Sequence, residues 1–565
     1  MPVTSTSPDN RRLPHRKHDS APPIKIAESR ISVRMLALVT LVSLCSFIWF
    51  CFRHEILLYG DAVAHINIAR HVFDCINPGL LRLGTVWLPL PHLLIIPFIV
   101  NQQMWTTGWG ASVPSMLAYI LGVIGIYKLV FLRLGKWPAL LAAAIYGLNP
   151  NLLYLQSTAM TEPVFLVFFI WSLVYLDRFL IGLRADDAFR EKYPPHKSLE
   201  YCAIALAASM LTRYDGWVYS AIFGIVVLIR WWTWRKGTGA PHLPQSADVG
   251  YESHRVARSL IAFMALCALM GALWLAQNYA LSGRPLDFMN GPYSAKAIEA
   301  RSMQAGSPPH PGTGSLMTST IYFLKDAKLN VSGGWLETPF FLIALAGALL
   351  VLRYHMPKSY LLLLLPIPFY AYSVACGSVP IFMPVWWPHS YYNVRYGIEL
   401  LPAFAVFISV AFYALLAASW RKEIRWAAQI ALVAIVAASY LLVAVQTPIS
   451  LREARVNSIT RVMLERRLAK ALRQIPPHSI ILMGTVDYVG ALQRAGIPLH
   501  RVIWEGAHTQ WEESLADPAK YANYVVAIRG DDVWYSVHRF PQHLVLWVQF
   551  DTPGKPRVSV YRVEK

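Results

Sequence analysis

The chain has 565 residues, of which 55% are hydrophobic and only 15% charged, and its mean hydropathy is +0.40. This composition leaves too little polar surface to cover a soluble globule, so it excludes a water-soluble enzyme and predicts a polytopic membrane protein. The formal charge of +19 would indicate nucleic acid as a partner of a soluble protein, but the basic residues here cluster in short connections between apolar runs, so we expect no nucleic-acid partner.

The chain begins with a basic stretch, residues 1–34, that precedes an apolar run without a small-residue cleavage site. We interpret it as a cytoplasmic tail followed by an uncleaved first span. The expected fold is mainly α, with about eleven transmembrane helices. The predicted spans are 35–52, 111–132, 137–150, 163–180, 199–212, 217–233, 259–279, 336–352, 359–376, 397–418 and 426–445.

Lysines and arginines decide the orientation, because cytoplasmic loops carry an excess of them. With the amino terminus inside, the following basic residues fall on the cytoplasmic side: Arg11, Arg12, Arg16, Lys17, Arg133, Lys136, Arg178, Arg184, Arg190, Lys192, Lys197, Arg230, Arg235, Lys236, Arg255, Arg258, Arg353, Lys358, Arg421, Lys422 and Arg425. The outer connections are longer and contain few lysines and arginines. We therefore expect a multi-pass protein of the bacterial inner (plasma) membrane with a cytoplasmic amino terminus.

The apolar segment 86–100 is interrupted by Pro89, Pro91, His92 and Pro97, and we interpret it as a re-entrant or surface helix. Irregular backbone at membrane depth needs protein or a wet cavity to cover it, so this interpretation predicts a cavity near Asp61. Four segments then share the outer side: 53–110, 151–162, 281–335 and 377–396. The long loop 281–335 is rich in Gly and Pro and is typical of a lid.

Hydropathy falls after residue 445, and residues 446–565 predict a soluble α/β domain on the outer face. Expected elements are a helix over 452–474, a short helix over 489–495 closed by Gly496, and strands at 479–484, 500–504, 524–528, 543–550 and 557–563. The domain has no Gly-rich phosphate loop and no nucleophile elbow. We expect it to dock, gate or present an acceptor.

Asp61 is the first candidate for catalysis, because it lies just past the first span, where a carboxylate can stay ionised and still reach a lipid-borne substrate. On a helix, Asp61 shares a face with His65, Ile68 and Val72, which predicts an amphipathic helix along the interface. The alternative is a solvated loop acid.

Glu162 is the second candidate acid, directly before Pro163 at the start of a predicted span on the same side as Asp61. An acid at a helix start is stabilised by the macrodipole, so an ordinary helix-start acid is the alternative. An acid at the membrane edge nevertheless marks a functional site.

Arg395 is the candidate phosphate ligand, because a guanidinium group matches phosphate oxygens and stays charged at the membrane edge. The alternative is an interfacial arginine in an aromatic belt. Further candidates for substrate binding are Tyr392, Asn393, Tyr396, Arg213, Asp215, His65 and His92, with Lys325, Lys328 and Arg284 as weaker phosphate candidates. The histidines and acids form no recognised ligand motif, and the six cysteines lack C-x-x-C spacing, so a metal site stays unassigned.

In their order along the chain and in their shared outer side, these features resemble the GT-C superfamily. Within it, the closest likeness is to protein O-mannosyltransferases and the lipid A aminoarabinose transferase. The likeness covers about residues 35–445. It implies that Asp61 is the catalytic carboxylate, that Glu162 is the second acid, and that Arg395 lies near the lipid phosphate. The chain departs from the family at one point: many relatives carry two adjacent acids here, whereas Asp61 is followed by Ala62. This difference affects whether a metal is bound and which acceptor is used.

The resemblance implies transfer of a sugar from a polyprenyl-phosphate donor to a hydroxyl of a glycan, lipid or protein acceptor on the outer face, with inversion and with Asp61 as general base. A divalent cation is a possible cofactor and membrane lipid a partner. A transporter or lipid flippase, or a ligase or polymerase for lipid-linked glycans, remains an alternative. Reporter fusions after Val445 are expected to place the carboxyl terminus outside.

Overall fold

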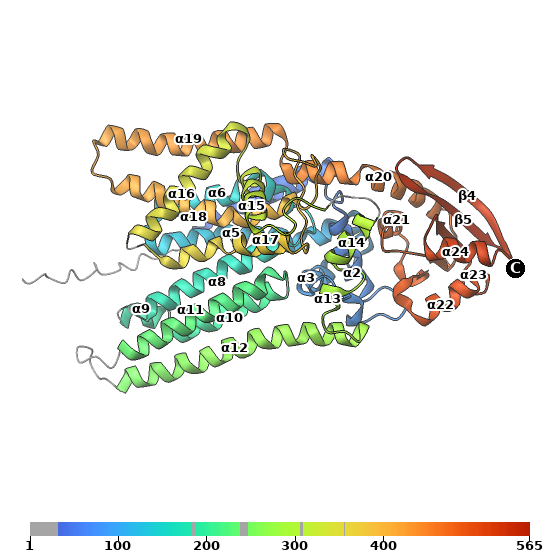
Figure 1. Cartoon of the computed structure of the whole chain (residues 1–565), viewed down its shortest axis with the longest axis horizontal. Coiled ribbons are helices and arrows are strands. Elements are labelled where there is room, and N and C mark those ends of the chain that lie inside the picture. Colours follow the sequence, from blue (N-terminus) through green and yellow to red (C-terminus); the bar gives the residue numbers. More distant parts are fainter. Residues whose placement is uncertain are drawn as a thin grey trace, which may run out of the picture.

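The computed structural model describes residues 32–183, 185, 187–237, 247–304, 309–354 and 356–564. Residues 1–31 of the predicted cytoplasmic tail lie outside the described residues, with Arg11, Arg12, Arg16 and Lys17, and so does Arg184. The described chain forms an elongated molecule, with a helical bundle at one end and a small mixed domain with the carboxyl terminus at the other (Figure 1).

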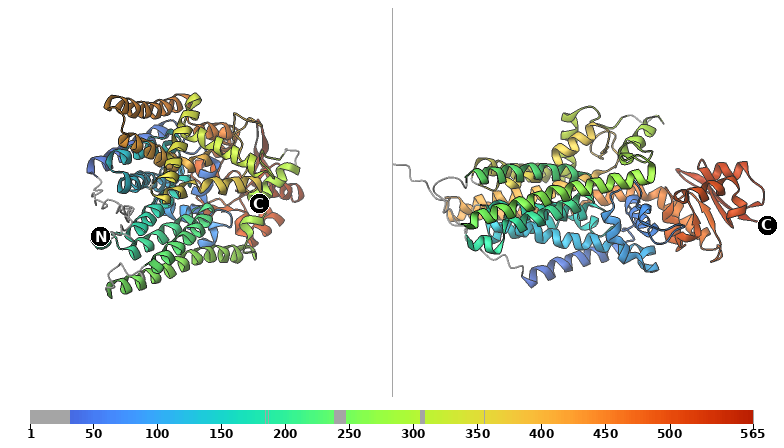
Figure 2. Two further views of the ribbon diagram at one scale, coloured as in Figure 1. Left: turned by 60° about the vertical axis from the view of Figure 1, so that its left-hand side comes forward. Right: turned by 90° about the horizontal axis from the view of Figure 1, so that it is seen from below.

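The bundle is built from helices that coincide with the predicted spans. They are α1 (Val33–Phe52), α5 (Trp109–Leu134), α6 (Lys136–Gly147), α8 (Glu162–Gly182), α10 (Pro195–Met210), α11 (Asp215–Gly237), α12 (Ala247–Ser282), α16 (Glu337–Arg353), η3 (Lys358–Leu364) with α17 (Pro366–Ala375), η4 (Val394–Leu400) with α18 (Leu401–Ala417), and α19 (Lys422–Gln446). Views from two further directions show these helices running side by side along the long axis (Figure 2).

Within the described residues, eight helical stretches are long and apolar enough to cross a membrane. The three predicted spans that fall short are α6, α10 and the η3–α17 pair. In the third of them the helix is divided, because α17 begins anew at Pro366 after η3. The protein is a multi-pass membrane protein, and about eleven spans agree with the structure.

One end of the bundle carries short helices that connect the spans. These are α2 (Gly60–His71), η1 (Leu80–Leu83), α3 (Leu90–Ile99), α4 (Gln102–Thr107), α7 (Pro150–Leu155), α13 (Asp287–Asn290), α14 (Ala295–Gln304), α15 (Leu316–Val331) and η2 (Gly334–Leu336). At the opposite end lie α9 (Asp187–Lys192) and the loop between α18 and α19. The predicted short helix of segment 86–100 is thus present as α3, with Pro97 inside it.

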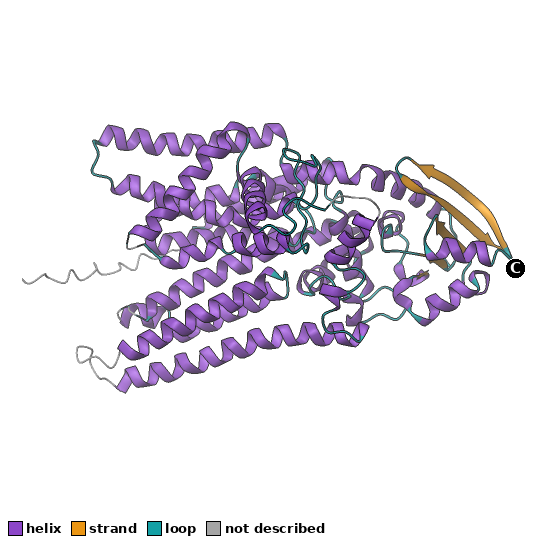
Figure 3. Ribbon diagram, in the orientation of Figure 1, coloured by secondary structure: helices purple, strands orange, loops and turns teal. Residues whose placement is uncertain are grey.

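The carboxyl-terminal domain follows α20 (Ile449–Leu472), which continues outward from α19 after a break at Thr447 and Pro448. Its elements are β1 (Ile481–Met483), α21 (Val489–Ala495), η5 (Leu499–Arg501), β2 (Val502–Ile503), η6 (Glu505–Ala507), α22 (Thr509–Ala516), α23 (Pro518–Tyr521), β3 (Tyr524–Ile528), α24 (Asp532–Arg539), β4 (Leu544–Thr552) and β5 (Lys555–Val563). The named strands all lie in this domain (Figure 3). The small α/β domain predicted from the sequence is confirmed.

The sheet has the order β2-β1-β3-β5-β4, with β1 parallel to β2 and β3, and β5 antiparallel to β3 and β4. Its central strand β3 is buried from Val525 onward, as expected for a strand covered on both faces. Gly496 ends α21 in the left-handed conformation with φ 72°, which agrees with the sequence prediction.

The domain is fixed to the short helices by an amide interlock. Asn67 Nδ2 on α2 donates to Gln493 Oε1 on α21 at 2.8 Å, and Gln493 Nε2 donates to the Trp105 carbonyl at 2.8 Å. Trp105 Nε1 closes the ring by donating to Asn67 Oδ1 at 3.1 Å. Because each buried amide is satisfied, α2 and α21 are held in one relative position.

This docking corrects one expectation. The sequence predicted α2 as an amphipathic helix lying along the membrane interface, but eight of its positions, among them Ala62, His65, Asn67 and Arg70, are buried. The helix packs between α3 and α21, so protein rather than lipid covers most of it.

Candidate active site

Asp61 lies in the first turn of α2, where the helix dipole favours a negative charge. Its side chain is 41% exposed. Tyr59, which precedes the helix, has extended backbone and a buried ring, so the chain turns into the helix with Asp61 facing outward. The carboxylate is therefore accessible from the end of the bundle that carries the carboxyl-terminal domain.

Glu162 opens α8, followed by Pro163 in the first turn. Its side chain is only 1% exposed, in contrast to that of Asp61. A carboxylate this deeply buried needs positively charged or hydrogen-bonding partners.

Arg395 is carried by η4, the tight helical turn that leads into α18. Asn393, before the turn, has φ 56°, and Asn is one of the few residues that adopt this left-handed conformation readily. Gly397 packs directly on α15, where an added Cβ would lie 2.5 Å from the Asp326 carbonyl carbon. Asn330 Nδ2 on α15 donates to the Val394 carbonyl at 2.6 Å, so the turn is fixed on both sides of Arg395.

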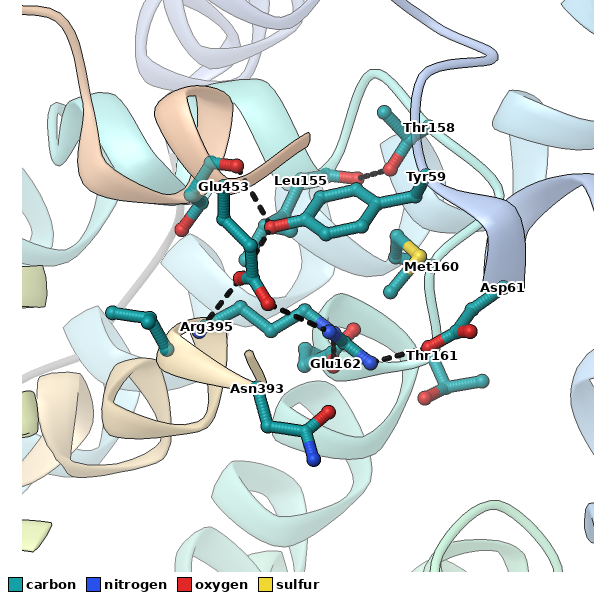
Figure 4. A network of polar contacts seen from close by, with 12 residues as sticks. Tyr59, Asp61, Leu155, Thr158, Met160, Thr161, Glu162, Asn393, Arg395 and Glu453 are labelled. Carbon is teal, nitrogen blue, oxygen red and sulfur yellow. Dashed lines mark hydrogen bonds and ion pairs between the residues drawn. The ribbon is translucent and has the colours of Figure 1, made fainter. Parts of the chain in front are cut away.

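Three carboxylates converge on the Arg395 guanidinium (Figure 4). Asp61 Oδ2 pairs with Nη2, Glu162 Oε1 accepts from Nε at 3.0 Å, and Glu453 Oε1 accepts from Nη1 at 3.3 Å. Only 6% of the Arg395 side chain is exposed. Asp61 and Arg395, which are 334 positions apart in the chain, are thus in direct contact.

A second cluster adjoins the first through Glu162. Arg213 Nη1 lies 3.4 Å from Glu162 Oε1, and Arg213 Nε lies 3.0 Å from Glu399 Oε1 and 3.5 Å from Asp215 Oδ2. Tyr370 joins this group, because its hydroxyl accepts from Arg213 Nη2 at 2.8 Å and lies 2.9 Å from Asp215 Oδ2. Arg213 therefore pairs with more than its neighbour Asp215.

The ring of Tyr396 lies between the two guanidinium groups. Its centroid is 4.6 Å from the Arg213 Cζ and 4.9 Å from the Arg395 Cζ, and Tyr59 covers Arg395 at 5.1 Å. These cation–π contacts orient both arginines. Tyr392, 42% exposed, pairs through its backbone with Phe382 at the rim of the site.

The two predicted histidines meet each other: His65 Nδ1 lies 2.9 Å from His92 Nε2, and both rings are buried. Burial, together with the guanidinium groups of Arg395 and Arg213, lowers the pKa of the His65 imidazole to about 3. Both rings are therefore neutral at physiological pH, with one nitrogen donating and the other accepting. They pack behind Asp61 and pair with neither Asp61 nor Glu162.

The weaker phosphate candidates lie elsewhere. Lys325 pairs with Glu337, and Arg284 lies 2.8 Å from Asp287. The segment predicted as a lid contains α13, α14 and α15, and α15 packs against η4 as a wall of the site. Residues 305–308 of this loop lie outside the described part.

The sequence analysis missed three contributors: Glu453, Glu399 and Tyr370. Glu453 lies in the predicted helix 452–474, where no local pattern separates it from the other charged residues. Glu399 follows Arg395 by four positions in an otherwise apolar stretch, and an acid in such a stretch indicates a functional site.

Among the described residues, no group of three His, Cys, Asp or Glu side chains is arranged to hold a metal ion. The Arg395 guanidinium lies where the carboxylates of Asp61, Glu162 and Glu453 converge, and its charge offsets theirs. A divalent cation at this site stays a prediction.

The fold and this site define a polytopic membrane protein with a charged centre at the domain-bearing end of its bundle. A family model described as dolichyl-phosphate-mannose-protein mannosyltransferase matches residues 98–243. The crystal structure of ArnT from Cupriavidus metallidurans bound to undecaprenyl phosphate is similar over 94% of this chain and 98% of that chain, with a TM-score of 0.55 and 12% identity.

Two structures of the oligosaccharyltransferase from Archaeoglobus fulgidus also match. The apo form has a TM-score of 0.46 and 10% identity over 87% of this chain and 69% of that chain. The complex of AglB with an inhibitory peptide and a dolichol-phosphate has a TM-score of 0.46 and 12% identity, over 94% and 74% of the chains. A search of curated proteins gives no match. The resemblance to GT-C membrane glycosyltransferases predicted from the sequence is confirmed.

Proposed function

We propose that this protein is an integral membrane glycosyltransferase that moves a sugar from a polyprenyl-phosphate donor to an acceptor hydroxyl on the extracytoplasmic face, with inversion. The observation that carries the proposal is the pairing of a half-exposed carboxylate, Asp61, with a buried guanidinium, Arg395, at the domain-bearing end of the bundle. Similarity to ArnT, whose structure holds undecaprenyl phosphate, supports a lipid-phosphate donor.

In the proposed reaction, the acceptor oxygen attacks the anomeric carbon while Asp61 takes the hydroxyl proton as general base. The bond between the anomeric carbon and the phosphate oxygen breaks, and the polyprenyl phosphate leaves with both bonding electrons. A single displacement of this kind inverts the anomeric configuration. The lipid tail stays in the bilayer throughout, which explains why the enzyme is a membrane protein.

Arg395 has two tasks in this scheme. Before the reaction, its contact with Asp61 orients the carboxylate. Once Asp61 has accepted the proton it is neutral, and the Arg395 charge loses one of its compensating partners. This happens as negative charge builds on the departing phosphate, so the guanidinium stabilises the transition state more than the ground state.

Glu162 takes a different part from the one expected. The resemblance implies a second acid that orients the acceptor or a bound cation, but the Glu162 side chain is 1% exposed and lies between Arg395 and Arg213. We infer that Glu162 fixes both arginines and does not touch the acceptor.

The test is transfer of label by the purified protein in detergent. Radiolabelled polyprenyl-phosphate hexoses are incubated with the protein and membrane extract, and the anomeric configuration of the product is determined. Transfer without any gradient, with inverted configuration, is the expected result. Binding of donor without transfer would favour a transporter or flippase, and a retained configuration would overturn the single-displacement mechanism.

A further inference from the structure

One carboxylate, that of Glu453 on α20, contacts both halves of the site. Its Oε1 accepts from Arg395 Nη1 at 3.3 Å, and its Oε2 accepts from the Arg395 backbone N–H at 3.3 Å. The same Oε2 lies 2.9 Å from the hydroxyl of Tyr59, two residues before Asp61. Its side chain is 1% exposed. A single buried group thus joins the segment that carries the acid to the turn that carries the arginine.

Later residues of α20 also contact both segments. Arg455 Nη2 lies 2.6 Å from Glu55 Oε1, and Arg461 Nη2 donates to the Leu58 carbonyl at 2.7 Å. On the other side, Asn457 Nδ2 donates to the Tyr391 carbonyl at 2.9 Å. The helix therefore contacts the segment before Asp61 and the segment before Arg395 over several turns.

Glu453 differs from Arg455, Asn457 and Arg461 of α20 because it brings a negative charge to the Arg395 guanidinium. The charged and titratable groups that face Glu453 are Asp61 and Tyr59 from the segment at α2, Tyr154 from α7, Arg395 and Tyr392 from η4 and its preceding loop, and Asp326 from α15. Glu162 from α8 pairs with the same guanidinium. Two buried carboxylates, Glu162 and Glu453, share the guanidinium with Asp61. Burial raises the pKa of the Glu453 carboxyl, whereas the Arg395 guanidinium and the Tyr59 hydroxyl favour its charged form. When it is charged, Glu453 weakens the attraction of Arg395 for the charged form of Asp61.

We propose that Glu453 is a positioning residue of the transfer reaction: it holds the segments carrying Asp61 and Arg395 in register and tunes the charge that Asp61 experiences. The helix leading into the soluble domain is then part of the catalytic apparatus. This inference rests on the proposed function of Asp61 as the base.

The test is the pH profile of kcat/KM for Glu453→Gln, measured with labelled polyprenyl-phosphate hexose and the full-length protein in detergent. Gln keeps the size of the side chain and removes its charge. We expect kcat to fall about tenfold, and the acid limb of the profile to move to lower pH by roughly 0.5 to 1 unit, because a negative charge beside the base is lost. A partly misfolded protein lowers the height of a profile and leaves its limb in place.

Glu465→Gln is the matched control, because Glu465 is a buried glutamate of the same helix that pairs with Arg461 and Arg494, outside the site. Its acid limb is expected to coincide with that of the wild type. The inference is overturned if the acid limb of the pH profile stays at its wild-type position in Glu453→Gln, or if it moves equally in both variants.

Two further variants keep the result interpretable. If Glu453→Gln does not fold, Tyr59→Phe removes the hydroxyl that lies against Glu453 and keeps the ring over Arg395. We expect it to lower kcat about fivefold, and unchanged kcat would contradict the inference. Asp61→Asn separates the two proposals. Full transfer by Asp61→Asn would refute the role of Asp61 as the base. If Asp61→Asn is inactive and the acid limb of the Glu453→Gln profile stays at the wild-type pH, only the positioning role of Glu453 is refuted.

Discussion

At the scale of single residues, Arg395 and its partners hold the site together by charge. Asp61, Glu162 and Glu453 occupy three different nitrogens of one planar group. A guanidinium presents its donors in a fixed plane, so the three carboxylates are fixed relative to one another as well. Only Asp61 is also open to the outside, which distinguishes the reacting acid from the supporting ones.

Arg395→Lys keeps the positive charge but replaces the planar donors by one ammonium group, which cannot meet three carboxylates at these positions. We expect the rate of sugar transfer to fall at least about 100-fold, as when one transition-state contact is lost. Initial rates with labelled donor measure the effect. Arg284→Lys, at an exposed arginine of the outer loop, is the control, and near-normal transfer by Arg395→Lys would show that the planar fork is unnecessary.

The buried His65 predicts how stability depends on pH. Its folded pKa of about 3 lies below the ordinary value of 6.5, so between these values the unfolded chain binds more protons than the folded one. Stability must therefore fall as the pH drops below 6.5, by about 2 kcal/mol for this group between pH 6.5 and 5.

Thermal unfolding in detergent at pH 7.5 and pH 5.0 tests this prediction. His65→Gln keeps a hydrogen-bonding group toward His92 and removes the titration, so the difference in Tm between the two pH values is expected to shrink. His389→Gln, at an exposed histidine, serves as control. An undiminished difference in His65→Gln would mean that His65 does not contribute.

At the scale of elements, the site depends on how closely η4 approaches α15. The backbone of Gly397 touches the Asp326 and Ala327 backbone, so there is no room for a Cβ. Backbone atoms on both sides cannot yield as a flexible side chain does. The position of Arg395, two residues earlier on the same turn, follows from this contact.

Gly397→Ala is therefore expected to push η4 off α15, to cost about 1 to 3 kcal/mol of stability and to abolish most of the transfer. Gly271→Ala is the matched control, because its added Cβ would meet its nearest neighbours at 3.9 Å, an ordinary contact distance. Tm and initial transfer rates measure both effects. Equal behaviour of the two variants would show that the close approach does not fix the turn.

Elements that depend on local sequence were predicted well. The strand Tyr524–Ile528 and the helix Val489–Ala495 with its closing Gly496 appear as expected, because turn residues and β-branched runs mark their ends. The eleven apolar segments were recognisable for the same reason. The helix α2 was placed in the membrane interface because its cover, α21, lies more than 400 residues later and sequence periodicity cannot reveal it.

The site was predictable in part. Asp61 and Glu162 each stand out as an acid at the edge of an apolar span, and Arg395 as a base in the same place. Glu453 does not stand out in the sequence, because its role comes from tertiary contacts with Tyr59 and Arg395. Its sequence neighbours are typical of an ordinary charged helix.

At the scale of the whole molecule, the structure separates two ends. The basic residues assigned to the cytoplasmic side, such as Arg133, Lys236 and Arg421, belong to the connections at the end of the bundle opposite the carboxyl-terminal domain (Figure 1). Asp61, Arg395 and the domain lie toward the other end. From the positive-inside rule we expect the site to face the outside.

Single cysteines in a cysteine-free background test this orientation. A cysteine at Arg529 in the soluble domain should react with a membrane-impermeant maleimide in intact cells or spheroplasts, and one at Lys236 only after lysis; both positions are exposed. The reverse pattern would place the site in the cytoplasm and contradict an extracytoplasmic reaction.

The central claim is that Asp61 accepts the proton of the attacking hydroxyl, and a single-turnover experiment tests it most directly. Labelled polyprenyl-phosphate sugar is bound to excess wild-type protein or Asp61→Asn, acceptor is added, and transfer is followed over time. We expect the variant to bind donor nearly as well as the wild type and to transfer its sugar at least about 100-fold more slowly. Transfer by Asp61→Asn at the wild-type rate would contradict the account.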